Sequence, residues 1–396
     1  MKWEKVEFGE LYLLPSKNGL NRPSRVRGSG YKMINMGELF AFDRIKDIPM
    51  ELVPMNDREI ETSNILEEDL LFARQSIVAS GAGKCSIVLE VPEITTFESH
   101  IIRVRLNTEK ASPLYYYYYF KSPFANMKSL VQQGVQAGIR GSELKNLIVS
   151  YPPLPTQRRI ASILSAYDDL IENNLKRIKL LEEKAFARYK LIVKSENNQP
   201  KIALGQLATI TSSKRIFLSD YVDSGVPFYR SKEIIAKSKF ESIDRPLYIT
   251  EERYNEIKEK FGAPNSGDLL ITSVGTIGFV HLVNEDDGVF YFKDGNLIWI
   301  RNLQQILSNY LFFKFKTREF KEMLNSIAIG SSQKALTIET VKKVEIEVPS
   351  DNALFEFNIE TQPIIKFIYN LQKQNTKLRE ARDILLPKLM SGQIEV

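Results

Sequence analysis

Cysteine and histidine are almost absent from this sequence of 396 residues. Cys85 is the only cysteine, and His100 and His281 are the only histidines. A single cysteine excludes an intramolecular disulfide, so we expect a reducing, cytoplasmic environment. One cysteine and two histidines are also too few for a zinc finger or a zinc hydrolase, and we therefore predict no metal site.

Long hydrophobic runs and a strong charge imbalance are missing as well. No apolar run reaches the roughly 18 residues that a membrane span needs, and the first residues show no signal-peptide pattern. The formal net charge of +5 is low for a nucleic-acid-binding protein. Basic residues do cluster between Arg22 and Arg27 and between Lys232 and Lys239. These clusters are either phosphate contacts or ordinary solvated loops. The hydrophobic fraction of 43% is typical of a globular chain, and the length predicts at least two domains.

Motifs for catalysis are absent or incomplete. Residues 151–154, Tyr-Pro-Pro-Leu, resemble the Asn/Asp-Pro-Pro-aromatic signature of amino-methyltransferases but lack its first and last residues. Residues 80–85 resemble the end of a phosphate-binding loop, but the first glycine is missing and Cys85 replaces the required Ser or Thr. Asp244 with residues 256–258 resembles a nuclease triad only loosely, and we interpret this segment as exposed and charged. The sequence therefore predicts no catalytic residue in this chain.

The sequence instead repeats itself at a nearly constant distance. Val6-Glu-Phe-Gly-Glu-Leu11 reappears about 196 residues later as Ile202-Ala-Leu-Gly-Gln-Leu207, and Asp69-Leu-Leu71 reappears about 199 residues later as Asp268-Leu-Leu270. Other matches follow in the same order, up to the segment that ends at Pro152 and its counterpart that ends at Pro349. An ordered series of matches is hard to obtain by chance, so we infer an internal duplication.

Each repeat has the same internal plan. Roughly the first 150 residues contain short alternating segments that predict strands, separated by helical patches and by turns marked with Gly or Pro. A long helical pattern then closes each repeat. We predict an α+β protein with two tandem α/β domains, residues 1–152 and 196–350, related by pseudo-twofold symmetry. Residues 153–195 and 351–396 are predicted as two long helices that separate the domains and pair as an antiparallel coiled coil.

The two helical segments carry a coiled-coil seam. Their apolar residues recur in alternating steps of four and three, the spacing of helices that pack along one stripe. A helix of about 35 residues is roughly 50 Å long and outruns a domain core, so each seam needs a partner helix. Pairing between the seams is favoured over pairing with another subunit or with the helix's own domain. The seams contain Ile160, Leu164, Tyr167, Ile171, Asn174, Ile178, Leu181 and Ala185 in the first helix, and Ile364, Ile368, Leu371, Asn375, Leu378, Arg382, Leu385 and Leu389 in the second.

One asparagine lies near the middle of each seam. In an antiparallel pair, Asn174 and Asn375 would fall near one layer and could hydrogen-bond to each other. A buried asparagine lowers stability but fixes the register of two helices. We therefore predict that this pair sets the spacing of the two domains.

Several segments resemble the specificity subunits of type I restriction–modification systems. Residues 153–174, Pro-Leu-Pro-Thr-Gln-Arg-Arg-Ile-Ala-Ser-Ile-Leu-Ser-Ala-Tyr-Asp-Asp-Leu-Ile-Glu-Asn-Asn, are similar to the central conserved region of that family. Residues 385–394, Leu-Leu-Pro-Lys-Leu-Met-Ser-Gly-Gln-Ile, are similar to the end of its second conserved region. Residues 72–76 and 267–278 resemble recurring elements of its target-recognition domains. The second repeat has Asp-Asn-Ala-Leu at residues 351–354 in place of Pro-Leu-Pro-Thr-Gln, so its helix should start differently.

The resemblance implies a sequence-specific DNA-binding subunit without catalytic activity of its own. Two target-recognition domains would each read one half of a bipartite site in double-stranded DNA. The helices would act as a ruler and would dock two methyltransferase subunits, with restriction-translocase subunits in the full complex. S-adenosylmethionine, ATP and magnesium would be cofactors of those partners. The alternatives are a specificity partner of a methylation-only or other restriction system, and a coiled-coil adaptor whose heads bind proteins.

Candidate DNA contacts are polar and basic side chains in loops that contain glycine, since such side chains can distinguish base edges. Predicted base contacts are Arg74, Gln75, Ser76, Lys84, Gln133, Gln136 and Arg140 in the first repeat, and Thr272, Ser273, Thr276, Ser331, Ser332, Gln333 and Lys334 in the second. Predicted phosphate contacts are Arg22, Arg25, Arg27, Arg230 and Lys232. The run from Tyr115 to Tyr119 could stack on bases, but its apolar counterpart at residues 310–314 favours a helix packed on the domain core.

Overall fold

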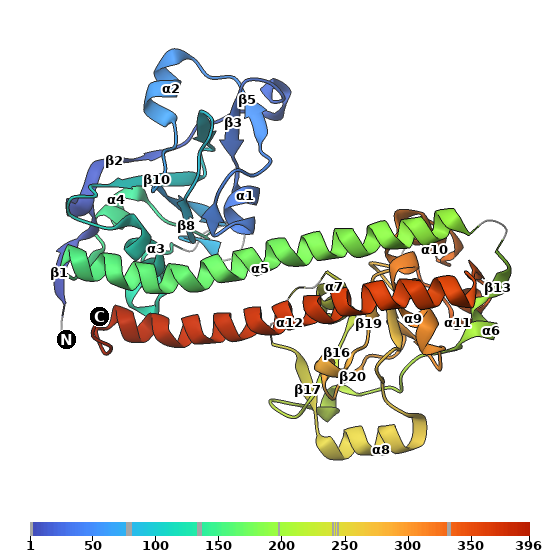
Figure 1. The fold of residues 1–396 in the computed structure, drawn as a ribbon. Helices are drawn as coiled ribbons and strands as arrows, with labels where there is room; N and C mark the ends of the chain where they lie inside the picture. The colour runs from blue at the N-terminus through green and yellow to red at the C-terminus, as the bar shows by residue number, and fades with distance from the viewer. Residues whose placement is uncertain are drawn as a thin grey trace. The chain divides into compact units, whose positions relative to one another are not determined.

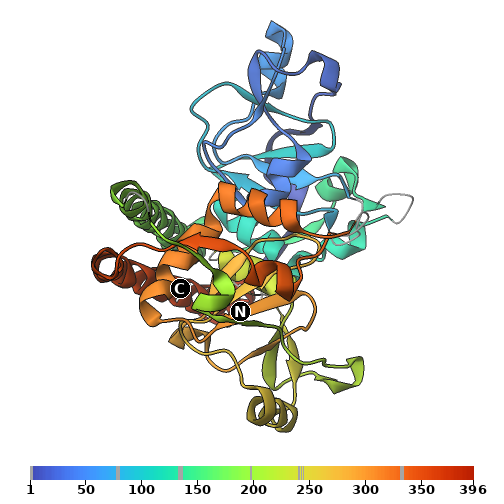
Figure 2. The same cartoon turned by 90° about the vertical axis from the view of Figure 1, so that its right-hand side faces the viewer.

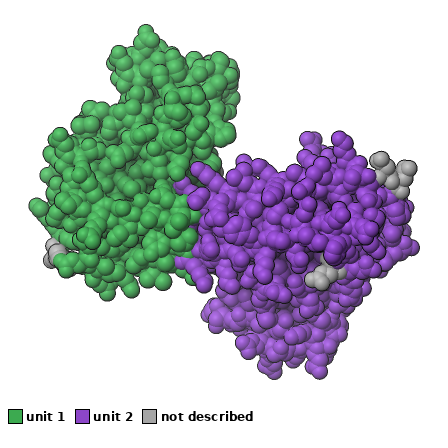
Figure 3. All heavy atoms as spheres, in the orientation of Figure 1, with its two compact units in different colours: residues 1–170, 378–396 green, residues 171–377 purple. Residues whose placement is uncertain are grey.

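The computed structural model describes residues 3–76, 81–132, 137–196, 199–239, 241, 243, 245–330 and 334–396. The chain divides into two compact units, which Figure 3 distinguishes by colour. Unit 1 comprises residues 1–170 and 378–396, and unit 2 comprises residues 171–377. Each unit contains one α/β domain together with a part of both long helices. No helix within the described ranges is both long and apolar enough to cross a membrane.

Unit 1 is built on a five-stranded sheet and a smaller three-stranded sheet (Figure 1). The larger sheet has the order β2 (Tyr12–Asn18), β10 (Ile101–Leu106), β6 (Leu70–Ala73), β8 (Cys85–Val88) and β4 (Arg44–Ile45), and the smaller has the order β5 (Glu51–Val53), β3 (Tyr31–Ile34) and β9 (Thr95–Phe97). Short ladders join β1 (Glu4–Glu7) to β12 (Ile148–Tyr151) and β7 (Gln75–Ser76) to β11 (Ala137–Gly138). The helices are α1 (Met36–Ala41), α2 (Asp57–Ser63), α3 (Pro113–Lys121) and α4 (Gly141–Lys145), with 3-10 turns η1 (Phe8–Leu11), η2 (Ser24–Val26), η4 (Pro123–Ala125) and η5 (Met127–Leu130).

The tyrosine run is part of the hydrophobic core of unit 1. Tyr115 to Tyr119 lie on α3, and each is at most 2% exposed. Burial raises the pKa of these tyrosines. The prediction of a helix packed on the domain core is confirmed, and these rings are not available to stack on bases.

Unit 2 has two four-stranded sheets. The first has the order β14 (Thr209–Thr211), β21 (Leu297–Arg301), β18 (Leu269–Thr272) and β19 (Val280–Leu282), and the second has the order β15 (Tyr221–Val222), β17 (Leu247–Ile249), β16 (Val226–Tyr229) and β20 (Tyr291–Phe292). A short ladder joins β13 (Lys201–Ala203) to β22 (Glu345–Glu347). The helices are α6 (Leu204–Leu207), α7 (Ser231–Ser238), α8 (Glu251–Phe261), α9 (Gln305–Lys316), α10 (Arg318–Ile327) and α11 (Ile338–Lys342), with 3-10 turns η6 (Leu218–Asp220) and η7 (Glu285–Asp287).

The two units share their strand connectivity, as the duplication predicts. The antiparallel ladder of β1 with β12 corresponds to that of β13 with β22. Strand β10 lies between β2 and β6, just as β21 lies between β14 and β18. The parallel pair of β3 with β9 corresponds to the parallel pair of β16 with β20. The prediction of two similar mixed α/β domains is confirmed.

The long helices are α5 (Leu154–Ser195) and α12 (Asp351–Met390). Within unit 2 they run side by side in opposite directions, as Figures 1 and 2 show from two sides. Asn174 of α5 contacts Asn375 of α12, and Arg188, further along α5, pairs with Glu360, which precedes Asn375. The prediction of a helix that extends to residue 396 is wrong, because α12 ends at Met390 and a turn follows.

In unit 1, Asp168 of α5 forms an ion pair with Arg382 of α12, with 2.5 Å between a carboxylate oxygen and a guanidinium nitrogen. Asp168 is 7% exposed and also accepts a hydrogen bond of 2.6 Å from the Tyr118 hydroxyl. This buried carboxylate lies one position beyond Tyr167, which the seam pattern had placed in the interface. Among the predicted seam residues, Ile160, Leu164, Ile171, Asn174, Ile178, Ile368, Leu371 and Asn375 are buried, and Leu181, Leu378 and Leu385 are half-buried.

The two helices start differently, as the sequence predicts. The fully buried Gln157 side chain accepts from the Ser112 N–H (2.9 Å) and donates to the Pro152 carbonyl (2.7 Å). At the start of α12, the Ser350 hydroxyl accepts from the Ala353 N–H at 3.4 Å. A side chain of α5 therefore ties the first turn of that helix to backbone groups of the domain, whereas a local cap fixes the start of α12.

Candidate nucleic-acid interface

Three loops of unit 1 meet where the central strands β6 and β10 lie side by side. The Arg74 N–H, directly after β6, donates to the His100 carbonyl, directly before β10 (2.8 Å). The Arg74 carbonyl accepts from the Ile139 N–H (2.9 Å), and β7 pairs with β11. We call residues 74–76, 99–100 and 137–140 the three-loop cluster of unit 1. It brings together the two loops that the sequence proposed separately, and it adds a third, residues 99–100, that the sequence did not identify.

Unit 2 builds the same arrangement from different side chains. The Ser273 N–H, directly after β18, donates to the Asn296 carbonyl, directly before β21 (2.9 Å). The Ser273 carbonyl accepts from the Leu336 N–H (2.8 Å), and Val274 forms an antiparallel bridge with Ala335. Residues 273–276, 295–296 and 334–336 form the three-loop cluster of unit 2. Backbone hydrogen bonds therefore fix both clusters in the same way.

Close backbone approach explains a glycine in this framework. A Cβ atom at Gly138 would lie 3.0 Å from the Arg74 carbonyl oxygen, which is tighter than ordinary contact. Gly138 also exchanges two backbone hydrogen bonds with Gln132, of 2.9 and 3.1 Å. The corresponding hydrogen bonds in unit 2 join Ala335 to Ile329. The close approach of Arg74 therefore favours glycine at position 138 of unit 1.

Two predicted base contacts in unit 2 are corrected by their burial. Thr272 is fully buried and its hydroxyl donates to the Thr276 carbonyl (2.6 Å), while Ser273 is 1% exposed and donates to the Gly295 carbonyl (3.2 Å). Both hydroxyls hold the loop in shape and do not face solvent. Thr276 and Lys334 are exposed at the cluster.

In unit 1 the predicted base contacts divide in a similar way. Arg74, Gln75 and Ser76 are half-buried in the cluster, and Arg140 is exposed. Lys84 is corrected, because its ammonium group donates to the Leu39 and Phe40 carbonyls (3.0 and 2.7 Å) and pairs with Asp43 (3.0 Å). These internal contacts leave Lys84 little capacity for DNA.

The predicted phosphate contacts differ in how much they are engaged within the domain. Arg22 pairs with Glu59 and lowers the pKa of that carboxyl, and Arg27 pairs with Glu51. Burial alone would raise the pKa of Glu233, but hydrogen bonds from Arg230 outweigh it, and the pKa is lowered. Lys232 also lies 3.3 Å from Glu233, but its side chain is 62% exposed, and Arg25 is exposed. Arg25 and Lys232 are therefore the accessible members of the predicted set, whereas Arg22, Arg27 and Arg230 stabilise the domains.

Lys321, which the sequence did not identify, forms a pair of cations with Lys239 of the predicted basic cluster, beside the three-loop cluster of unit 2. Lys239 and Lys321 lie 5.8 and 4.8 Å from the centre of the Phe279 ring, and the Phe279 N–H donates to Thr272. Burial lowers the pKa of Lys321, Glu182 opposes this shift, and Lys239 reinforces it. Lys321 lies on α10, far from this loop in sequence, so only the fold reveals the pair.

Some predicted residues lie outside the described part of the chain. They are Gln133, Gln136, Ser331, Ser332 and Gln333, and also Asp244 of the loose nuclease pattern. The roles predicted for the first five remain predictions. Glu256 of that pattern lies on α8, where it is exposed and pairs with Arg253 (2.8 Å).

The asparagines of the two seams meet inside unit 2. Asn174 and Asn375 are 5% and 1% exposed, and the Asn174 amide donates to the Asn375 carbonyl oxygen at 2.9 Å. The Asn375 amide lies 3.5 Å from the Ile171 carbonyl oxygen of α5. The predicted contact between the two side chains is therefore present. Its role in setting the domain spacing remains a prediction.

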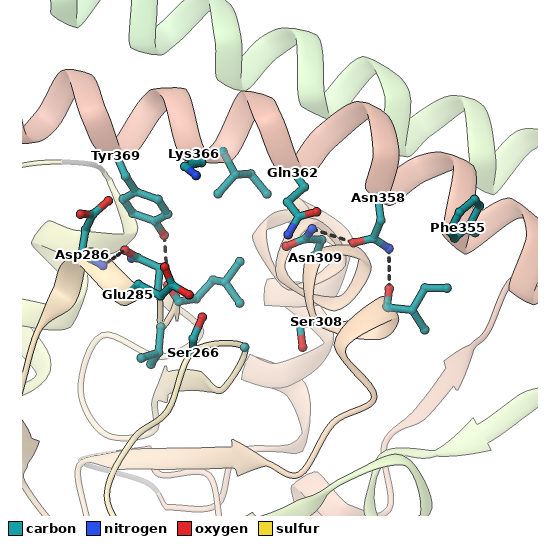
Figure 4. A pocket seen from close by; sticks show the side chains of 16 residues that line it. Ser266, Glu285, Asp286, Ser308, Asn309, Phe355, Asn358, Gln362, Lys366 and Tyr369 are labelled. Carbon is teal, nitrogen blue, oxygen red and sulfur yellow. Dashed lines mark hydrogen bonds between the residues drawn. The ribbon is translucent and has the colours of Figure 1, made fainter.

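A pocket of about 580 Å³ lies against α12 in unit 2 (Figure 4). Asn309 donates to Asn358 (2.7 Å) on one wall, and the Tyr369 hydroxyl donates to the Leu282 carbonyl (3.0 Å) on another. Phe355 lies at the edge of this pocket and is 59% exposed. Ile359, one turn further along α12, is 58% exposed. This side of α12 therefore presents a hollow next to two uncovered apolar side chains.

These features define a class of protein: an internally duplicated chain with two α/β domains, each of which exposes a three-loop cluster and packs on an antiparallel helix pair. The family model for the type I restriction modification DNA specificity domain matches residues 2–183 and again residues 196–386. The chain belongs to this family.

Individual relatives agree with this assignment. The chain is 28% identical over 252 residues to a putative type I restriction enzyme specificity subunit of Haemophilus influenzae, covering 61% of each protein. It is 22% identical to the putative type I restriction enzyme MjaX specificity subunit of Methanocaldococcus jannaschii, over 100% of this chain and 94% of the relative. The fold is similar to that of the type I restriction–modification S subunit of M. genitalium, with a TM-score of 0.61 at 16% identity over 98% and 96% of the two chains.

Proposed function

We propose that this chain is the DNA-recognition subunit of a type I restriction–modification complex, and that each domain reads one half of a bipartite site with its three-loop cluster. The observation that carries the proposal is the repeated cluster. Both units use the same backbone hydrogen bonds around Arg74 and Ser273, but they present different side chains. A fixed backbone with exchanged side chains suits two readers of different half-sites.

Positive side chains near the clusters would supply the contacts that position DNA without specifying its sequence. Lys239 and Lys321 have this role in unit 2. In unit 1, Arg140 is exposed within the cluster, and Arg25 is exposed on η2, outside the cluster. Because such cations are few, phosphate contacts contribute modestly to affinity in this chain.

Partner subunits would supply the chemistry. Two methyltransferase subunits would dock on the helices and bind S-adenosylmethionine, and restriction-translocase subunits would use ATP and magnesium. Phe355 and Ile359 on α12 support docking there, because large apolar side chains that are more than half exposed are favourable anchors for a partner. The variant with both residues changed to alanine should co-purify less methyltransferase subunit, whereas Val289→Ala, at another exposed apolar residue, should not change co-purification.

The central test is adenine-methylation mapping across the genome, with the chain present and with it deleted. A bipartite motif that is methylated only in the presence of the chain is the expected result. An unchanged methylation pattern in cells that express the partner subunits would contradict the proposed function.

A further inference from the structure

The third loop of each cluster is a turn that leads into the central strand. In unit 1 it contains Ser99 and His100, and in unit 2 it contains Gly295 and Asn296. The His100 carbonyl is held by Arg74, and the Asn296 carbonyl is held by Ser273 and, at 3.5 Å, by the Ser231 hydroxyl. The backbone of this turn is thus fixed in both units, and the two side chains occupy equivalent positions.

Neither of these two side chains takes part in the internal bonding of its domain. His100 is exposed and Asn296 is half-buried, and neither side chain hydrogen-bonds to any residue that the structure describes. Asparagine in a turn commonly bonds to the adjacent backbone. Asn296 does not do so, although Thr272 and Ser273 beside it are fully engaged. The amide group of Asn296 is therefore available at the centre of the cluster.

The chemistry of the two side chains suits base edges better than phosphates. Phosphates attract cations most strongly, and the clusters hold exposed cations at other positions, Arg140 in unit 1 and Lys334 in unit 2. An asparagine amide can form two hydrogen bonds with N6 and N7 of adenine in the major groove. A neutral imidazole has one N–H donor, which matches the acceptors N7 and O6 of guanine.

We propose that His100 and Asn296 are equivalent base-reading positions, each of which selects one base pair of its own half-site: His100 a pair that contains guanine, and Asn296 an A·T pair. The proposal rests on the proposed function of the two clusters. It explains why the turn makes the same backbone hydrogen bonds in both units but carries a different side chain in each. It also predicts that the two positions act independently, because each belongs to a different half-site.

The test is an exchange of the two side chains in the full chain, co-expressed with its methyltransferase subunits. His100→Asn should change or relax one base pair in one half of the methylated motif and leave the other half intact. Asn296→His should do the same in the other half. The matched controls are Lys110→Asn and Asn255→His, at exposed residues outside the clusters, and both should leave the motif unchanged.

Binding in vitro resolves variants that lose methylation altogether. Duplexes altered at one position at a time are bound to the assembled complex, and wild type should lose about tenfold in affinity at the selected base pair. His100→Ala and Asn296→Ala should each abolish this penalty at one position only. If wild type methylates a bipartite motif, but all variants keep both the motif and the wild-type binding profile, the proposal is overturned. If wild type shows no bipartite motif at all, the proposed function itself fails.

Discussion

The hydrogen bond between Asn174 and Asn375 allows a quantitative test of the helix pair. In the single variant Asn174→Leu, the Asn375 carbonyl oxygen loses its 2.9 Å donor while it remains buried at 1% exposure. A buried polar group without a partner costs about 1–3 kcal/mol. Asn375→Leu removes the 2.9 Å acceptor of the Asn174 amide, which keeps only a longer bond of 3.4 Å to the Gln374 side chain, so this variant should cost about 1 kcal/mol or more.

The double variant should behave differently from the sum of the two single variants. With leucine on both helices no polar group is stranded, and the apolar layer should be as stable as wild type or more so. The coupling free energy between the two sites should therefore exceed about 2 kcal/mol in magnitude. For a unit of roughly 200 residues, a loss of 2 kcal/mol corresponds to a decrease of about 4–8 °C in the melting temperature.

The assay is thermal unfolding of the full chain and its three variants, followed by circular dichroism at 222 nm. Thr376→Leu is the matched control, because Thr376 is exposed on the same turn of α12 and should shift the transition little. If the double variant is as unstable as the two single variants added together, the two amides do not stabilise the helix pair as a coupled unit.

Further predictions concern the charged groups and DNA binding. Asp168→Asn removes the buried carboxylate of Arg382 but keeps its pair with Asp383, so it should lower stability by about 1.5–3 kcal/mol in denaturant unfolding, whereas a variant as stable as wild type would contradict a role for the buried pair. Lys321→Ala should weaken DNA binding of the complex similarly for all sequences and reduce the slope of log affinity against log salt by about 0.9, and an altered motif would argue for base contact instead. Burial would raise the pKa of Asp287, but charge and hydrogen bonding from His281 and Lys237 outweigh burial and lower this pKa. The stability that the ionised carboxylate contributes above pH ~4 should therefore be lost as the pH falls. Asp287→Asn should flatten this pH dependence of the free energy of unfolding. The isolated chain should bind DNA weakly at physiological salt, and nanomolar specific binding without partners in a gel shift would disagree with its low net charge.

The duplication, the long helices and the contact between Asn174 and Asn375 could be predicted because they depend on periodicity and spacing along the chain. The orientation of loop side chains could not. Thr272 looks like a polar loop residue in the sequence, but the fold turns its hydroxyl inward to the Thr276 carbonyl. Arg22 forms an ion pair with Glu59, which is distant in sequence. Lys321 of α10 contacts the Phe279 ring only because the fold places the two residues side by side. Such pairings depend on tertiary contacts that residue type and spacing do not encode.

The two buried asparagines do not occupy equivalent positions of the repeat. At the offset of about 197 residues in this region, Asn174 aligns with Leu371, and Asn375 aligns with Ile178. An antiparallel pair formed by α5 from two molecules, in the same register, would set Asn174 against Ile178, and a pair formed by α12 would set Asn375 against Leu371. Either combination strands a buried amide, whereas α5 with α12 satisfies both. Although the two halves of the chain are similar, the positions of the two asparagines thus favour pairing of α5 with α12 over pairing of either helix with the same helix of a second molecule.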